Sequence, residues 1–165
     1  DENYKTLLHI KENQLIKAFE RNNMSCMIVK DEEELHHYLK NILTDQKKVA
    51  VGGSVTLTQL GVIDLIKKSD VHFIDRYEEG LSQEQVVERL REGLLSDIFI
   101  TSTNALTMDG CLYNVDGRGN RVSAMIFGPK DVYVIAGLNK ISSMNRKQSI
   151  IFVNIVQPAK CFTSA

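Results

Sequence analysis

Two glycines and two hydroxyl side chains come together in the stretch VGGSVT. Gly52 and Gly53 permit close approach of the backbone to a ligand, and Ser54 and Thr56 add hydroxyl donors. The residues before them are typical of a strand and those after them of a helix, whose first N–H groups would face a bound anion. The pattern predicts a phosphate or carboxylate site. The alternative is a tight turn in which Ser54 only caps its helix.

Two further loops offer charged groups at the ends of expected strands. In DRYEEG, residues 75–80, Glu78 or Glu79 could serve as a general base or nucleophile. In GLNK, the ammonium group of Lys140 could bind an anion. The alternative for both loops is a solvated surface in which the charges have no ligand.

The stretch of residues 101–130 is rich in turn-forming residues, including two Asp-Gly pairs that favour tight turns. One hypothesis is that four of its polar side chains face a cleft and hold a small anion: Asn104, Asn114, Asn120 and Arg121. The guanidinium group of Arg121 could pair bidentately with a carboxylate or phosphate. The alternative is structural, with amides satisfying loop backbone groups and glycines adopting positive φ.

Metal and cofactor sites are not expected. His36 and His37 have no acidic or cysteine partner at metal-ligand spacing. The cysteines at positions 26, 111 and 161 form no C-x-x-C pair, so an iron–sulfur cluster is not supported in this chain. No G-x-S-x-G motif is present, so hydrolysis by a serine triad is not expected.

The composition of the chain argues against two classes of partner, nucleic acids and membranes. The chain of 165 residues has a net charge of −1 and 7% aromatic residues, which gives no basis for nucleic-acid binding. No apolar run is long enough for a membrane span, and the cysteine usage fits a reducing compartment, so we expect a cytoplasmic protein. The length predicts one domain over residues 1–165.

Apolar runs typical of strands alternate with amphipathic segments typical of helices. The expected strands are MSCMIVK, KVAVGG, VHFID, DIFIT and VYVIAG. Because parallel strands need helical crossovers, this order predicts an α/β fold in three layers, an open and mainly parallel sheet with helices on both faces. Residues 104–125 interrupt the alternation with the short runs ALT, CLYNV and VSAMI. They predict an inserted region of antiparallel hairpins.

Local signals mark where the helices begin and end. Asp31 is a predicted N-cap, and Gly61 should break the helix that follows Ser54. Ser82 and Gln85 form a predicted capping box ahead of a helix with an apolar face, formed by Val86, Val87, Leu90, Leu94 and Leu95. In an open α/β sheet, ligands bind beyond the carboxyl ends of the strands, where these loops gather.

Three segments together resemble the lactate-utilization (LUD) domain family: VGGSVTLTQLGV, DRYEEG and SDIFITSTNALTMDGCLYNVDGRGNRVSAMIFGPKDVYVIAGLNKI. The resemblance covers residues 25–141, approximately. It implies a fold similar to the group of sugar-phosphate isomerases, glucosamine-phosphate deaminases and coenzyme A transferases. Members of that group place a turn rich in Gly, Ser and Thr against a phosphate or acyl-thioester, which favours an anion site at residues 52–56.

The resemblance also implies a function. It suggests that the protein binds a small anionic metabolite in lactate or other organic-acid oxidation, beside iron–sulfur and lactate-oxidising partner proteins. One alternative is a non-catalytic subunit that assembles with such oxidoreductases. Another is an enzyme like a sugar-phosphate isomerase or coenzyme A transferase, with Glu79 as base or nucleophile. Whether the chain is an enzyme stays open, and the hairpin region is a candidate surface for a homodimer.

The sequence departs from the family pattern after residue 141. Family members continue with an amphipathic helix and a segment like Pro-x-Asn-Ala-x-Arg-Leu, whereas here SIIFVNIV is typical of a strand. The codons for QPAKCFTSA, read after dropping one base, can encode Ser-Pro-Pro-Asn-Ala-Leu-Arg-Leu. We hypothesise a frameshift at residues 142–148, which sequencing the gene would test; the alternative is coincidence from codon degeneracy.

Overall fold

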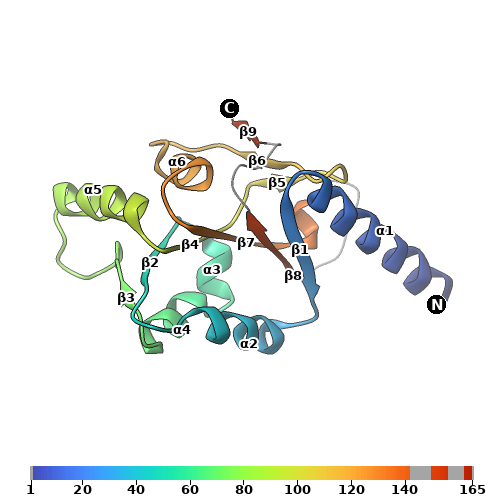
Figure 1. Ribbon diagram of the computed structural model, residues 1–165, viewed down its shortest axis with the longest axis horizontal. Coiled ribbons are helices and arrows are strands. Elements are labelled where there is room, and N and C mark those ends of the chain that lie inside the picture. The colour runs from blue at the N-terminus through green and yellow to red at the C-terminus, as the bar shows by residue number, and fades with distance from the viewer. Residues whose placement is uncertain (1, 142–149, 156–161, 165) are drawn as a thin grey trace.

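The computed structural model describes residues 2–141, 150–155 and 162–164 (Figure 1). The helices are α1 (Glu2–Arg21), α2 (Glu32–Ile42), α3 (Val55–Gln59), α4 (Val62–Lys68), α5 (Gln83–Glu92) and α6 (Asn120–Ile126), with short 3-10 helices η1 (Gly93–Leu95) and η2 (Leu138–Lys140). The strands are β1 (Met24–Val29), β2 (Lys48–Val51), β3 (His72–Phe73), β4 (Ile98–Thr101), β5 (Ala105–Leu106), β6 (Leu112–Asn114), β7 (Asp131–Gly137), β8 (Ile150–Ile155) and β9 (Phe162–Ser164).

The main sheet has six strands in the order β1-β8-β7-β4-β2-β3. Strands β3, β2, β4 and β7 pair in parallel, while β8 lies antiparallel between β7 and β1. A second sheet contains β5, β6 and β9. The mainly parallel sheet confirms the predicted α/β class, and it brings the carboxyl ends of β2, β3, β4 and β7 to one edge.

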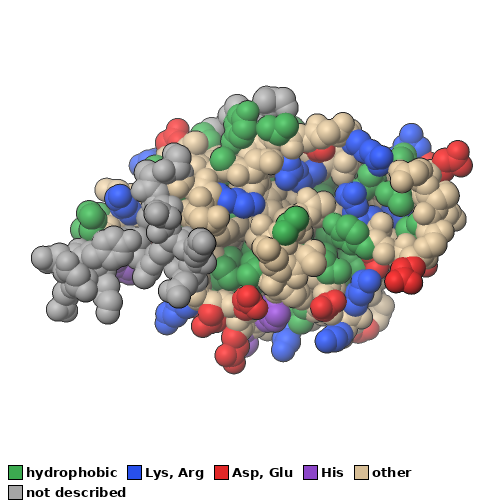
Figure 2. All heavy atoms as spheres, turned by 180° about the vertical axis from the view of Figure 1, so that it is seen from behind, with side chains coloured by type: hydrophobic (Ala, Val, Ile, Leu, Met, Phe, Trp, Pro, Cys, Tyr) green, Lys and Arg blue, Asp and Glu red, His purple; other side chains and the backbone are tan. Residues whose placement is uncertain are grey.

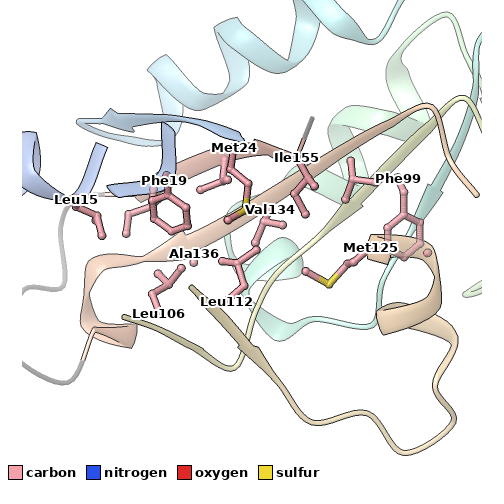
Figure 3. Packing of buried hydrophobic residues seen from close by; sticks show 14 of the residues in the cluster. Leu15, Phe19, Met24, Phe99, Leu106, Leu112, Met125, Val134, Ala136 and Ile155 are labelled. Carbon is pink, nitrogen blue, oxygen red and sulfur yellow. The ribbon is translucent and has the colours of Figure 1, made fainter. Parts of the chain in front are cut away.

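Both faces of the main sheet are buried, which makes the fold three-layered. Along β4, Phe99 packs on one face and Ile98 and Ile100 on the other, because successive side chains of a strand point in opposite directions. Helices α2, α3 and α4 cover one face, and α1, α6 and the β5–β6 hairpin cover the other (Figure 1). Figure 3 shows the second of these cores, where Phe19 and Met24 pack beside Val134. The continuously apolar strands therefore contribute side chains to two hydrophobic cores, one on each face of the sheet.

Most of the predicted helix signals are confirmed. The Asp31 side chain accepts a hydrogen bond from the Glu34 N–H, and Ser82 and Gln85 form the complete capping box. Gly61 has a φ of 63° and separates α3 from α4. The Ser54 prediction is wrong in one respect: Ser54 is the N-cap residue of α3, but its side chain caps no N–H among the described residues.

The hairpin prediction is confirmed for β5 and β6, which pair antiparallel between β4 and β7 in the chain. It is wrong for VSAMI, which belongs to helix α6 rather than to a strand. Within this run Ala124 and Met125 point into the core, while Ile126 is exposed. Ala124 and Met125 are consecutive, so an extended strand would place them on opposite faces, whereas the helix turns both toward the core.

The segment before β4 also differs from the expectation. Helix α5 ends at Glu92 and has no fully buried residue, and Leu95, expected on its apolar face, is 80% exposed. In Figure 1, α5 projects away from the main sheet.

In the described part of the chain, no helix has the length and apolar character needed to cross a membrane.

The predicted strand SIIFVNIV is present as β8 over residues 150–155, and five of its six side chains are buried. Because β8 pairs with both β1 and β7, it is an interior strand of the sheet. The proposed frameshift, at residues 142–148, lies outside the described residues.

Candidate functional site

A cavity of about 570 Å³ opens among the loops that follow β2, β3 and β6. It is lined by Gly53, Arg76, Gln83, Val86, Asn104, Val115, Asp116, Gly117, Arg118, Asn120 and Arg121. Four predicted ligand-binding residues are thus brought together here, namely Gly53, Asn104, Asn120 and Arg121. They come from positions far apart in the chain, and the parallel strand order places their loops at one edge of the sheet.

Arg121 is held in the cavity by three contacts of its guanidinium group. Its Nη2 donates to Asn104 Oδ1 and to the Val115 carbonyl oxygen, both at 2.7 Å, and its Nη1 lies 3.5 Å from the Ser102 carbonyl oxygen. All three acceptors are neutral. The guanidinium group is therefore fixed in position while its positive charge is not neutralised by these contacts.

Asp116 organises the loop that carries two of the arginines. Its carboxylate accepts hydrogen bonds from the backbone N–H groups of Arg118, Arg121 and Val122, at 3.2, 2.8 and 3.0 Å. Burial acts to raise the pKa of Asp116, but these three N–H donors and the charge of Arg121 outweigh it and hold the pKa below its usual value. The carboxylate is thus committed to shaping the start of α6.

Arg76 follows β3 directly and lies against the glycine turn. A Cβ atom on Gly53 would lie 3.5 Å from its Nη1. Its guanidinium group also lies over the Tyr77 ring, 5.4 Å from the centroid. The Nε atom of Arg76 is buried and has no hydrogen-bond partner among the residues that the structure describes. A buried donor without a partner is costly, so the Arg76 guanidinium group has a hydrogen-bonding capacity that the described residues do not meet.

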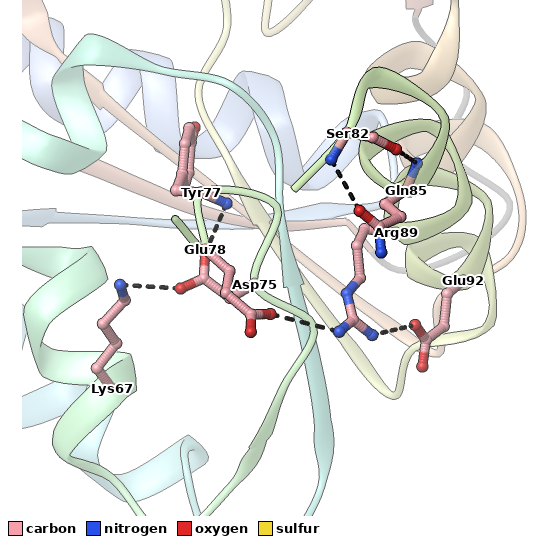
Figure 4. Close-up of polar contacts among 8 residues, drawn as sticks. All are labelled: Lys67, Asp75, Tyr77, Glu78, Ser82, Gln85, Arg89 and Glu92. Carbon is pink, nitrogen blue, oxygen red and sulfur yellow. Dashed lines mark hydrogen bonds and ion pairs between the residues drawn. The ribbon is translucent and has the colours of Figure 1, made fainter. Parts of the chain in front are cut away.

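The acidic residues around Arg76 are engaged elsewhere (Figure 4). Asp75 pairs with Lys67 at 2.8 Å and accepts the Tyr77 N–H at 2.7 Å. Glu78 pairs with Arg89 at 3.4 Å. Glu79, the candidate base or nucleophile, is exposed and is not among the residues that line the 570 Å³ cavity. The loop therefore contributes Arg76 to the cavity rather than a carboxylate.

Gly52 is buried beside Arg121 and precedes the cavity residue Gly53. Its N–H donates to the Ile100 carbonyl oxygen at 2.9 Å. A Cβ atom here would overlap Thr101 Oγ1, and would lie 2.9 Å from Thr101 Cβ and 3.3 Å from Arg121 Cγ. Only glycine therefore lets β2 approach β4 and Arg121 this closely.

Two of the predicted residues line a second cavity, of about 460 Å³, between α3 and the end of β7 with η2. Thr56 and Lys140 are both part of its wall. Lys140 Nζ donates to Ser102 Oγ at 2.7 Å and to the Thr103 carbonyl oxygen at 2.5 Å. Burial, and then the charge of Arg121, lower the pKa of Lys140. Six of the nine predicted residues are thus divided between these two cavities.

Two further residues of the predicted site, Asn114 and Ser54, line neither cavity. Asn114 is 2% exposed, and its Oδ1 atom has no hydrogen-bond partner in the described part of the chain. Ser54 is half-buried and lines neither the 570 Å³ nor the 460 Å³ cavity. Among the described residues, no group of three or more His, Cys, Asp or Glu side chains could hold a metal ion.

Arg76 and Arg118 line the cavity although neither was a predicted site residue. Arg76 comes directly after the expected strand VHFID, so its position at a carboxyl end was the available signal. Arg118 lies in the DGRGN turn, where the Asp-Gly pair, the glycines and Asn120 gave signals but the arginine gave none. Figure 2 shows Lys and Arg side chains among backbone and uncharged groups over one face of the molecule.

Replacing Asp116 with Asn should lower the free energy of unfolding at pH 7 by about 1 kcal/mol, the usual size of a lost capping interaction. Because the folded-state pKa of Asp116 is depressed, the difference from the unchanged protein should be complete above about pH 4 and vanish as the pH falls further. Urea unfolding at pH 7 and pH 3 measures this. Glu33→Gln, on the exposed side of α2, is the control and should show no comparable loss. An equal loss at both pH values would contradict the role of the carboxylate.

The fold and the site together define an α/β domain with an arginine-lined cavity at the carboxyl ends of its parallel strands. Residues 12–145 match the LUD domain family, and this span contains every loop that lines the cavity. The chain belongs to the LUD domain family, which confirms the resemblance and connects it with lactate utilization in general. A search among curated proteins finds no match. Strand β8 lies beyond the matched span.

Proposed function

We propose that the domain binds a small organic anion in the 570 Å³ cavity and does so within a system for the use of lactate or related organic acids. The observation that carries this proposal is the state of Arg121, which neutral oxygens hold in place beside two further arginines. A charge fixed in advance loses little freedom when it binds a ligand of opposite charge. Asn104 supports the proposal because its Oδ1 orients Arg121 while its own side chain lines the cavity.

The ion pairs of the described residues leave the cavity arginines without a carboxylate partner. Asp116 is a carboxylate that also lines the cavity, but its oxygens accept hydrogen bonds from backbone N–H groups. Positive charges that cost free energy to bring together are commonly retained for a ligand. A bound anion would relieve this repulsion, and family membership supports an organic acid as the compound.

Arg121→Met should abolish anion binding while leaving the fold intact, because the half-buried stem keeps its apolar contacts and only the charge is lost. Thermal unfolding would be followed with lactate and pyruvate as probes; a ligand at 100 times its Kd adds about 2.7 kcal/mol to the stability. The control is Arg91→Met, which removes the same charge from the exposed surface of α5, where Arg91 pairs with Glu88. Stabilisation that persists in Arg121→Met would refute this location for the site.

A further inference from the structure

We infer that the ligand of the arginine cavity carries a phosphoryl group, and that the cavity prefers a phosphorylated organic acid to lactate itself. This inference rests on the proposed function and specifies the substrate class of the same site. Its basis is the charge, the donor geometry and the size of the cavity.

The first argument is charge. Three arginines and one aspartate line the cavity, an excess of two positive charges in a chain whose net charge is −1. This balance already counts Asp116, whose two carboxylate oxygens accept hydrogen bonds from three backbone N–H groups. A monocarboxylate such as lactate would leave the cavity positively charged. A ligand with two or more negative charges would match it.

The second argument is donor geometry. A guanidinium group forms a two-pronged pair with a carboxylate through Nη2 together with either Nη1 or Nε. Arg121 Nη2 already makes two hydrogen bonds, to Asn104 Oδ1 and the Val115 carbonyl oxygen, so neither pair of donors is complete. The bidentate pairing that the sequence suggested for Arg121 is therefore not available while these bonds hold.

A phosphoryl group does not need that pairing. Its tetrahedral oxygens accept single hydrogen bonds from several directions, and the three arginines come from different segments: Arg76 from the loop after β3, Arg118 from the loop after β6 and Arg121 from the start of α6. Arg76 comes from one side with an unsatisfied Nε, and Arg118 from the exposed DGRGN turn. Separate donors of this kind suit a phosphoryl group better than a single planar carboxylate.

The third argument is size. A cavity of about 570 Å³ has the volume of about twenty water molecules. Lactate would fill only a small part of it, and the remaining water would screen the arginines. The volume is within the range of sites that enclose larger organic ligands. A phosphorylated acid fills more of the cavity and places its second charge among the arginines.

The test compares two probes that differ only in the phosphoryl group, lactate and 2-phospholactate, by isothermal titration of the full chain. We expect 2-phospholactate to bind at least tenfold more tightly than lactate. Arg76→Gln and Arg118→Gln should each reduce this preference at least threefold, and Arg91→Gln on α5 should leave it unchanged. Arg118 is exposed, so its substitution keeps the test valid if Arg76→Gln fails to fold.

The outcomes separate the two proposals. Lactate binding as tightly as 2-phospholactate would overturn the phosphoryl inference and leave the proposed organic-anion site in place. A preference unchanged in both Arg76→Gln and Arg118→Gln would overturn the assignment of the phosphoryl group to these arginines. Failure of both compounds to bind would overturn the inference together with the proposed function.

Discussion

Gly52→Ala should lower the free energy of unfolding by about 2 to 3 kcal/mol, the upper part of the range for overpacking a buried site. The added methyl group would overlap Thr101 Oγ1 and lie 2.9 Å from Thr101 Cβ. Thr101 is fully buried in β4, so it has no room to withdraw. Because the methyl group would also lie 3.3 Å from Arg121 Cγ, we expect anion affinity to fall with stability.

The experiment is a double-mutant cycle by urea unfolding, with Thr101→Ala as the second change. Thr101→Ala removes Oγ1, the closer of the two obstacles, but keeps Cβ, so it should relieve part of the cost of Gly52→Ala. Gly53→Ala is the matched control, since its Cβ would meet nothing closer than 3.5 Å. It should change stability by less than about 0.5 kcal/mol. Equal effects at the two glycines would show that the turn, and not the approach to Thr101, sets the requirement.

The fold could be predicted because its signals are local and repeated. The strands with two buried faces, such as β4 and β7, appear in the sequence as continuous apolar runs, and this pattern is specific to sheets covered on both sides. The helix caps at Asp31 and Ser82 are also local signals, because each involves a partner three residues further along the chain. Helix α6 was missed because its start depends on Asp116, whose carboxylate accepts N–H groups five and six residues ahead. The chain must turn at Gly119, whose φ is 75°, to bring the Asp116 carboxylate to these N–H groups.

The candidate site was harder to predict because it depends on which loops become neighbours. The glycine turn, Asn104 and Arg121 carried recognisable chemistry, and the strand order brings Gly53, Asn104 and Arg121 into one cavity. Arg76 carries no motif of its own. It becomes a cavity residue because β3 pairs with β2, which places the loop after β3 beside Gly53. Arginine is common on protein surfaces, so only this pairing distinguishes Arg76 from Arg89 and Arg91.

The hairpin connects the cavity with the end of α1. Its strands begin beside Asn104, whose N–H donates to the Tyr113 carbonyl oxygen at 3.2 Å. Its tip, at Asp109 and Gly110, contacts the end of α1, where Asn22 Nδ2 donates to both carbonyl oxygens at 3.0 and 2.9 Å. The position of the loop that carries Val115 and Asp116 therefore depends on contacts at α1.

Gly110 should be the most sensitive position of this hairpin. Its φ is 80°, and a Cβ atom would lie 2.5 Å from the Ala18 carbonyl carbon and 2.7 Å from the Phe19 nitrogen. These obstacles are backbone atoms inside α1, so they cannot move without distorting the helix. Gly110→Ala should therefore cost about 3 to 4 kcal/mol, combining the strain of a left-handed residue with overpacking.

Gly80→Ala separates these two contributions. Gly80 has nearly the same φ, 86°, but a Cβ atom there would have no heavy atom within 4 Å. It should cost only about 1 to 2 kcal/mol, the strain alone. The difference between the two variants, measured by urea unfolding, gives the cost of separating the hairpin from α1. If Gly110→Ala costs no more than Gly80→Ala, the hairpin is not anchored by this contact, and the cavity loops must be held by the sheet alone.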